Sequence, residues 1–323
     1  MSPAPLPDLD AMMDVTRRLE AARAADPVLA GAEPVELIRH VAGRRAIVAG
    51  RLGGEDVIFR LDLTGEARRT QAEWDEMLRL WPHMAEGRFR IARPIHAAPA
   101  HGLLVCERVA GTPMLRRLRK TGQGNGADLL RPVADWFRQS TAMSEARRLA
   151  DPGGWLRRAT EAAGRQPFAA LRRHEGPLLA EMERLAEVMQ GASWRTAICH
   201  GDLHPNNLIV KRDRITAIDL GGSSRMPVYK DMARFLLHMA RRDVVPSGRV
   251  AYGVDRAGLE AFAAAFGLDA TERGLFLPFL LGFEALIRVE SDVLPQSRID
   301  RAERLYADLL PDMARAGTDD AVL

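Results

Sequence analysis

The chain has 323 residues, of which 47% are hydrophobic and 28% are charged, and its formal net charge is +3 at pH 7. These values exclude a disordered or fibrous chain and are typical of a folded protein with a sizeable core. The arginines occur as scattered pairs and not as one block. Such pairs are typical of solvated helix faces, so we expect no nucleic-acid surface.

Cysteine content and hydropathy favour a cytoplasmic location for the protein. Cys106 and Cys199 lie in apolar runs and are too few for a disulfide framework, which favours buried free thiols in a reducing environment. The first residues lack the basic and apolar stretches of a secretory signal. The apolar stretch 274–287 is too short to span a bilayer and contains Glu284. We expect a cytoplasmic monomer or homodimer that does not bind membranes.

The first third of the chain has the pattern of a small β-rich region. β-branched residues alternate between breaks at Gly43 and Gly53, which predicts strands joined by tight turns. Trp74 and Trp81 share one face of a following helix. The predicted elements are a helix over 9–25, strands over 35–41, 45–52 and 56–62, a helix over 68–84, and two strands within 89–109, the first ended by Pro94.

The remainder of the chain has a helical pattern with one strand-like exception at 198–222. A β-rich part followed by a helical part predicts an α+β fold with two lobes, 1–108 and 109–323. The predicted helices cover 127–148, 168–191, 231–242, 256–266, 271–290 and 297–315.

The strand-like exception, "ICHGDLHPNNLIVKRDRITAIDLGG", concentrates polar residues in an apolar setting. "NLIVK" and "ITAID" predict a hairpin, which would bring Asn207 and Asp219 together at its open end. Asp202 precedes Asn207 by five residues, in the loop that leads to the same end. A carboxylate and an amide suit a hard cation such as Mg²⁺, and a further carboxylate can take a proton from a substrate hydroxyl.

The segment "HGDLHPNN" also has the H-x-D-x-x-x-x-N spacing of phosphoryl-transfer enzymes, through His200, Asp202 and Asn207. It resembles the H-G-D-x-H-x-x-N motif of the aminoglycoside phosphotransferase and choline kinase superfamily, small-molecule relatives of the protein kinases. The resemblance extends over most of the chain and implies a two-lobe protein-kinase-like fold. It implies Asp202 as catalytic base, Asn207 and Asp219 as Mg²⁺ ligands, and His200 and His204 as residues that shape the loop.

The resemblance assigns further residues around this motif. "VYKDMARFLLHM" is similar to a family segment in which Asp231 caps its helix and braces the catalytic loop. In the first lobe, Arg60 stands where the commonest pattern has a lysine, and the two side chains are not equivalent toward phosphate. Its expected partner is Glu73, with Glu76 as the second choice.

The same resemblance makes residues 1–108 the nucleotide-binding lobe, with ATP as the cofactor together with Mg²⁺. The turn that contains Gly43 would lie over the phosphates, although a single glycine is a thin version of such a loop. The segment "CERVAGTPM" resembles the hinge between the lobes, where backbone groups of Glu107 to Val109 would meet adenine.

The favoured function is therefore an ATP-dependent kinase of a small hydroxyl compound. Two alternatives stay open: a catalytically weak nucleotide-binding regulatory protein, suggested by Arg60, and a metal-dependent hydrolase, suggested by the H-x-D-x-H pattern. The sequence does not identify the acceptor, a sugar, an amino alcohol or an aminoglycoside-like compound, nor choose between ATP and GTP. Residues 224–323 hold 13 Lys/Arg and 15 Asp/Glu, and aromatic residues make up only 6% of the chain, so neither an acidic pocket nor an aromatic cage is indicated.

Overall fold

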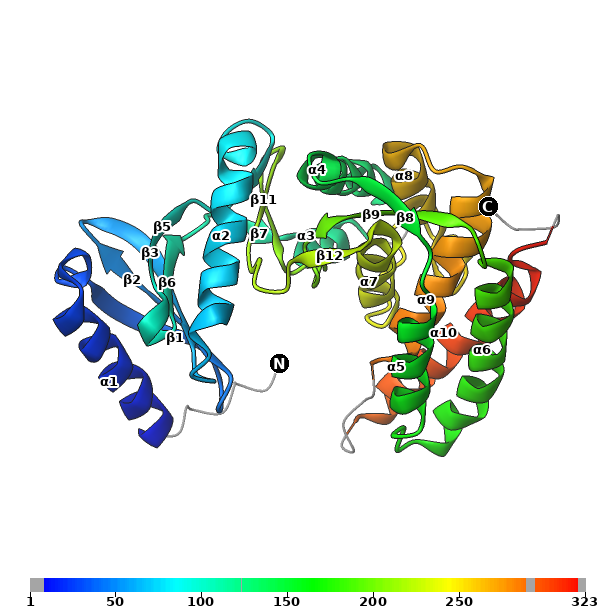
Figure 1. The fold of residues 1–323 in the computed structure, drawn as a ribbon, viewed down its shortest axis with the longest axis horizontal. Coiled ribbons are helices and arrows are strands. Elements are labelled where there is room, and N and C mark those ends of the chain that lie inside the picture. The colour runs from blue at the N-terminus through cyan, green and yellow to red at the C-terminus, as the bar shows by residue number, and fades with distance from the viewer. Residues whose placement is uncertain (1–8, 123, 289–293, 319–323) are drawn as a thin grey trace. The chain divides into compact units, whose positions relative to one another are not determined.

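A computed structural model describes residues 9–122, 124–288 and 294–318 (Figure 1). The chain divides into two compact units, the first made of Met1–Gly111 with Lys211–Gly222 and the second of Thr112–Val210 with Ser223–Leu323. The predicted α+β fold class is confirmed. A single cut between residues 108 and 109 does not describe the division, because the segment Lys211–Gly222 returns to the first unit.

The main sheet of the first unit has five strands in the order β1-β2-β3-β6-β5, all antiparallel. The three strands predicted between residues 35 and 62 are confirmed to within two residues at each end. The turns that join them contain Gly43 and Gly53, with φ of 62° and 59°, a conformation that favours glycine. The strands are β1 (Glu33–Val41), β2 (Arg45–Leu52), β3 (Glu55–Asp62), β5 (Pro94–Ala98) and β6 (Leu103–Glu107).

The region 89–109 differs from its prediction at Pro94, which begins β5 instead of ending a strand. A proline is tolerated at the first residue of a strand because no ladder donor is needed there. The residues before it form a separate short strand, β4 (Phe89–Ile91), which pairs in parallel with β11 (Arg214–Ala217). The chain therefore carries the residues after β11, including Asp219, into the first unit.

Two helices, α1 (Leu9–Ala25) and α2 (Ala67–Met84), lie on opposite sides of the main sheet (Figure 1). Phe59 and its alternate neighbours on β3 pack with residues of α1 in one hydrophobic core. Because successive residues of a strand point to opposite faces, Arg60 lies on the other face, which α2 covers. Short 3-10 turns, Pro27–Leu29 and Pro99–His101, complete the described part of this unit.

The second unit is mainly helical. The predicted helix over 127–148 ends early, because 146–149 form a strand, and the helix predicted over 271–290 begins with a π-helical turn. The last residues of that prediction, 289–290, lie outside the described residues. The helices are α3 (Met114–Thr121), α4 (Leu130–Ala142), α5 (Gly153–Ala163), α6 (Ala169–Val188), α7 (Val228–Ala240), α8 (Arg256–Phe266), α9 (Leu277–Leu286) and α10 (Gln296–Arg315), with the short turns Ala127–Leu129 and Glu272–Phe276.

Of these helices, α3 and α5 were not predicted, and the others agree with the sequence pattern within a few residues. Helix α9 is buried along its whole length. Within the described parts of the chain, no helix has both the length and the apolar character needed to cross a membrane.

Short strands complete the described part of the second unit and position the loop that contains "HGDLHPNN". Strand β9 lies between β8 and β12 in an antiparallel sheet, and β10 pairs with β7. Residues 200–207 connect β9 to β10, so both ends of the motif are fixed by sheet pairing. The strands are β7 (Thr112–Pro113), β8 (Ala146–Leu149), β9 (Ser193–Cys199), β10 (Leu208–Lys211), β12 (Ser224–Pro227), β13 (Val250–Ala251) and β14 (Val254–Asp255).

Gly50 on β2 provides a test of packing in the first unit. A Cβ at this position would lie 2.2 Å from the backbone oxygen of Glu33 and 2.8 Å from Cε2 of Phe59, whereas a Cβ on Gly31 would meet nothing within 4 Å. We expect Gly50→Ala to lower the free energy of unfolding by about 1–3 kcal/mol, as overpacking does. Gly31→Ala should leave it within about 0.5 kcal/mol. Equal urea midpoints for the two variants would contradict this packing.

Candidate active site

In the first unit, Arg60 joins two carboxylates that are far apart in the sequence. Its Nη1 lies 3.1 Å from Oε1 of Glu73, and its Nη2 donates to Oδ1 of Asp219 at 2.6 Å. Arg45 donates from Nη1 to the other oxygen of Asp219 at 3.0 Å. Burial by itself would lower the pKa of Arg60, but Glu73 and Asp219 raise that pKa above its ordinary value. Arg60 is therefore a fixed positive charge. Glu76, the second choice as its partner, pairs with Arg79 instead, at 2.7 Å.

The backbone after β11 allows these groups to approach closely. Asp219 has a φ of +66°, a left-handed conformation that aspartate tolerates better than most residues. A Cβ on Gly221 would lie 2.8 Å from Oε2 of Glu73, so the glycine of "IDLGG" makes room for that carboxylate. The motif thus places Asp219 beside Arg60 by backbone conformation as well as by charge.

The other residues predicted to bind nucleotide also lie in the first unit. Gly43 is in the turn between β1 and β2. Glu107 ends β6, and its carboxylate accepts hydrogen bonds from Nη2 of Arg90 at 3.2 Å and from the backbone N–H of Arg93 at 3.1 Å. Val109 is half-buried in the segment that follows β6. The Glu107 side chain is therefore engaged within its own unit.

In the second unit, the loop between β9 and β10 is held by hydrogen bonds of its own residues. The amide Nδ2 of Asn207 donates to the backbone oxygen of Asp202 at 3.1 Å. The backbone N–H of Asn207 donates to the backbone oxygen of His204 at 2.9 Å, and Asn206 N–H donates to Nδ1 of His204 at 3.2 Å. His200 is buried and meets the ring of Trp136 edge-on at 6.3 Å. The His200 ring therefore packs against Trp136, and the His204 ring accepts a hydrogen bond from the backbone of the loop.

Asp231 fixes the loop from α7. Its Oδ2 accepts a hydrogen bond from the backbone N–H of Gly201 at 2.9 Å, and Lys230 donates from Nζ to the backbone oxygen of Gly201. The prediction that Asp231 caps its helix is wrong, because α7 already begins at Val228, after Pro227. Asp231 lies inside the first turn, where its carboxylate is directed to the loop and not to its own helix terminus.

Positive side chains surround the carboxylate of Asp202. Nε and Nη2 of Arg234 both lie 2.8 Å from Oδ1 of Asp202, and Nη2 of Arg288 lies 3.9 Å from it. Nε2 of His204 lies 3.6 Å from Oδ2. Burial would raise the pKa of Asp202, but Arg234, followed by His204 and Arg288, holds that pKa below its ordinary value. Asp202 is therefore ionised at neutral pH.

Sequence reasoning missed three arginines beside the predicted residues, namely Arg45 at Asp219 in the first unit and Arg234 and Arg288 at Asp202 in the second. Arg234 follows Asp231 by three residues on one helix, a spacing that puts both on the same face. Arg288 similarly follows the buried Glu284 by four residues, and its Nη2 lies 3.5 Å from Oε2 of Glu284. These spacings can be seen in the sequence, but no local sequence pattern indicates that either arginine contacts Asp202.

The two groups of residues belong to different units, with Asp219 in the first and Asp202 and Asn207 in the second. The predicted convergence of Asn207 and Asp219 stays a prediction. Within the ranges that the structure describes, no group of three or more His, Cys, Asp or Glu side chains could hold a metal ion. A Mg²⁺ site made of one Asn, one Asp and phosphate oxygens does not need such a group.

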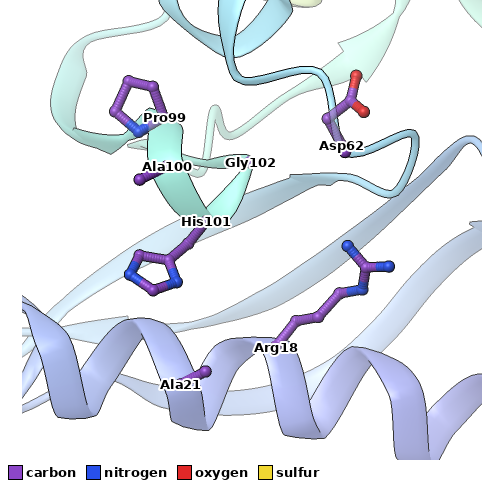
Figure 2. A pocket seen from close by; sticks show the side chains of 8 residues that line it. Arg18, Ala21, Asp62, Pro99, Ala100, His101 and Gly102 are labelled. Carbon is purple, nitrogen blue, oxygen red and sulfur yellow. The ribbon is translucent and has the colours of Figure 1, made fainter.

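In the first unit, a hollow of about 180 Å³ lies between α1 and the 3-10 turn Pro99–His101 (Figure 2). Arg18, Asp62 and His101 line it, and Arg18 is paired with Asp14 at 3.1 Å. None of the residues predicted to bind nucleotide lines this hollow. Both cysteines are free and buried, as predicted, and burial raises the pKa of Cys106 to about 12.

The model of the phosphotransferase enzyme family (APH) matches residues 44–268, more than half of the chain. The chain therefore belongs to this family, and it is a small-molecule kinase. No curated protein matches the chain.

Solved structures with the same fold include an aminoglycoside-3'-phosphotransferase of type VIII, with 20% identity over 83% of this chain and 98% of that chain and a TM-score of 0.53. An amicoumacin kinase in complex with AMP-PNP, Ca²⁺ and Ami has 15% identity over 95% and 98%, with a TM-score of 0.56. A choline/ethanolamine kinase family protein from Mesorhizobium loti has 16% identity over 94% and 99%, with a TM-score of 0.56. These likenesses show the protein-kinase-like fold.

Substitution of the two arginines at Asp219 tests which of them is structural. The Arg60 side chain is 15% exposed and that of Arg45 is 36% exposed. We expect Arg60→Met to lower the free energy of unfolding by about 3 kcal/mol, because two carboxylates lose a buried partner. Arg45→Met should cost less than about 1 kcal/mol, since solvent replaces an exposed pair. Equal losses in chemical denaturation would contradict the assignment of Arg60 as the central cation.

Proposed function

We propose that the protein transfers the γ-phosphoryl group of ATP to a hydroxyl of a small molecule, with Asp202 as the catalytic base. The observation that carries this proposal is the ionised carboxylate of Asp202, on a loop that Asp231 and Lys230 hold in place. Phosphoryl transfer depends mainly on positioning and charge neutralisation, so a rigid loop with a fixed carboxylate suits it.

In this proposal Asp202 accepts a hydrogen bond from the acceptor hydroxyl, aligns its oxygen with the γ-phosphorus and takes the proton as transfer proceeds. A weakly basic carboxylate is sufficient, because a loose transition state needs little deprotonation of the nucleophile beforehand. Arg234 and Arg288 keep this carboxylate ionised and are placed to offset negative charge that builds up around it.

The residues assigned to Mg²⁺ have suitable chemistry. The Nδ2 of Asn207 is engaged by the backbone oxygen of Asp202, which directs the amide so that its oxygen is the group left for a cation. The carboxylate of Asp219 is oriented by Arg45 and Arg60 and keeps further lone pairs on both oxygens. When bound, Mg²⁺ would neutralise phosphate charge. An AMP-PNP complex with Ca²⁺ in the amicoumacin kinase supports ATP and a divalent cation as cofactors.

In the first unit, Arg60 would pair with the nucleotide phosphates while Glu73 holds its guanidinium in position. The turn at Gly43 would cover the phosphates, and backbone groups from Glu107 to Val109 would contact adenine. The solved relatives are named as kinases of aminoglycosides, amicoumacin, choline or ethanolamine, and glucosamine, which supports a small hydroxylated acceptor.

The test is ADP release from ATP and Mg²⁺ across a library of hydroxyl compounds. Asp202→Asn should lower kcat by about a hundredfold to ten-thousandfold, the range for loss of a general base. Asp213→Asn, which alters an exposed aspartate in the turn after β10, should leave kcat within about twofold.

The alternatives to this function give different results in the same assay. Hydrolysis of a library compound with Zn²⁺ or Mn²⁺ and without ATP would indicate a hydrolase. Binding of ATP with no turnover in the whole library would indicate a regulatory nucleotide-binding protein.

The pH dependence of the reaction tests the role of Arg234. Because Arg234 lowers the pKa of Asp202, the ionised base persists below the ordinary aspartate pKa, and kcat/KM should fall only at lower pH. In Arg234→Met that pKa rises, so the acidic limb of the profile should move to higher pH. Arg249→Met, an exposed arginine of the same unit, is the control and should leave the limb in place. An unmoved limb in Arg234→Met would argue against Asp202 as the titrating base.

A further inference from the structure

A cavity of about 340 Å³ lies within the second unit, and two arginines of its lining also approach Asp202. Its volume is near the lower end of the range of about 300–1,000 Å³ for small-molecule sites. Helix α7 and the residues after it, the end of α9 and the start of α10 contribute its walls. Its polar lining consists of Arg234, His238, Arg241, Arg242, Arg288 and Arg298.

Two of these arginines connect the cavity directly to the proposed catalytic base. Arg234 and Arg288 line the cavity and also approach Oδ1 of Asp202, at 2.8 and 3.9 Å. A molecule in the cavity would therefore lie next to the carboxylate that is proposed to orient the acceptor. This position makes the cavity a site for the acceptor within the second unit.

The positive charge of the cavity exceeds the carboxylates that the described residues place around it. Near the loop, three cations are balanced by three carboxylates. Arg234 pairs with Asp202, and Arg288 pairs with Glu284. Lys230 pairs with Asp231 and lies 3.6 Å from Glu284. The cavity lining adds Arg241, Arg242 and Arg298 and, in the described parts of the chain, no carboxylate.

One of the added arginines has a clear structural role. Arg241 donates from Nη2 to the backbone oxygen of Ala285 at 2.6 Å and from Nη1 to that of Arg288 at 3.3 Å, which satisfies carbonyls at the end of α9. Arg242 has only the backbone oxygen of His238 as a partner among the described residues, at 3.2 Å, and Arg298 is exposed. Arg242 and Arg298 are therefore the lining arginines that no structural role explains.

The arginines repel one another. Burial, followed by the charges of Arg298, Arg234, Arg119 and Arg241, lowers the pKa of Arg242 to about 10. Burial, followed by the charges of Arg242, His204, Arg234 and Arg288, also holds the pKa of His238 far below its usual range, so this histidine is neutral. A bound anion would relieve this repulsion, whereas an ammonium group would increase it.

We propose that this cavity binds an anionic group, a phosphate or a carboxylate, on the small molecule whose hydroxyl is phosphorylated. The inference rests on the proposed function and specifies its substrate class. Planar guanidinium groups bind phosphate and carboxylate oxygens with paired hydrogen bonds, and Arg242 and Arg298 are the groups available for this contact. Cationic amines are disfavoured as the part of the acceptor that enters this cavity.

Binding of inorganic phosphate, measured by calorimetry at constant ionic strength, tests the anion site without knowledge of the acceptor. We expect R242Q/R298Q to weaken phosphate binding at least tenfold. The control R301Q/R304Q removes the same charge from α10 outside the cavity lining and should stay within twofold of the wild type. Equal weakening in both double variants, or no weakening in either, would overturn the proposal.

A nucleotide phosphate has the same chemistry as the proposed group, so the titration is repeated with saturating AMP-PNP and Mg²⁺. Retention of phosphate binding, still sensitive to R242Q/R298Q, supports an acceptor site. Loss of binding would assign the arginines to the nucleotide and overturn the proposal.

Turnover of matched acceptors provides the second arm. Ribose is compared with ribose 5-phosphate, glycerol with glycerate, and ethanolamine with glycolate. We expect turnover with the anionic member of at least one pair, and R242Q/R298Q should raise its KM at least tenfold. Turnover of only neutral or cationic members would overturn the substrate class and leave the kinase function intact. Absence of all turnover, with arginine-dependent phosphate binding preserved, would count against the kinase function and leave the anion site supported.

Discussion

The ion pair between Asp202 and Arg234 is the interaction on which the proposed catalytic loop of the second unit depends. A partly buried carboxylate is stabilised by a positive partner, and here the partner comes from α7, the helix that also supplies Asp231 and Lys230 to the loop. One helix therefore sets both the charge state of Asp202 and the backbone conformation that presents it. The buried Glu284 extends this network to Arg288, so α9 takes part in positioning the same group.

In the first unit the charges are reversed, and a positive side chain is stabilised by carboxylates. Arg60 is the half-buried charge, and Glu73 from α2 and Asp219 from the segment after β11 are its partners. Strand alternation puts Phe59 into the hydrophobic core and Arg60 on the other face, toward α2. An arginine in place of a lysine can hold both carboxylates at once, because its planar fork offers separate donors to each.

Much of this arrangement could be predicted from sequence patterns. The alternation of β-branched residues predicted the first strands, and the resemblance to the kinase superfamily implied Glu73 as the partner of Arg60. The structure also shows why other features could not be predicted. Helix α3 and strand β8 are short, so their patterns are too brief to distinguish from loops, and β8 exists because it pairs with β9.

The positive charge of the cavity is the feature that sequence patterns were least able to predict. Residues 224–323 are nearly neutral as a set, yet arginines from three segments collect on one wall of the second unit. Which face of α7 or α10 meets the cavity depends on how the helices pack, and no local pattern in the sequence contains that information. The contact of Arg234 and Arg288 with Asp202 was unpredictable for the same reason.

The most direct test of the account follows the transferred group itself. The protein is incubated with Mg²⁺, γ-labelled ATP and a protein-free extract of small metabolites, and the labelled products are separated by anion exchange. The account predicts that the label appears in a small phosphate ester that carries further negative charge, with the wild-type protein and not with Asp202→Asn. Label that appears only as inorganic phosphate, or an ester formed equally well by Asp202→Asn, would contradict it.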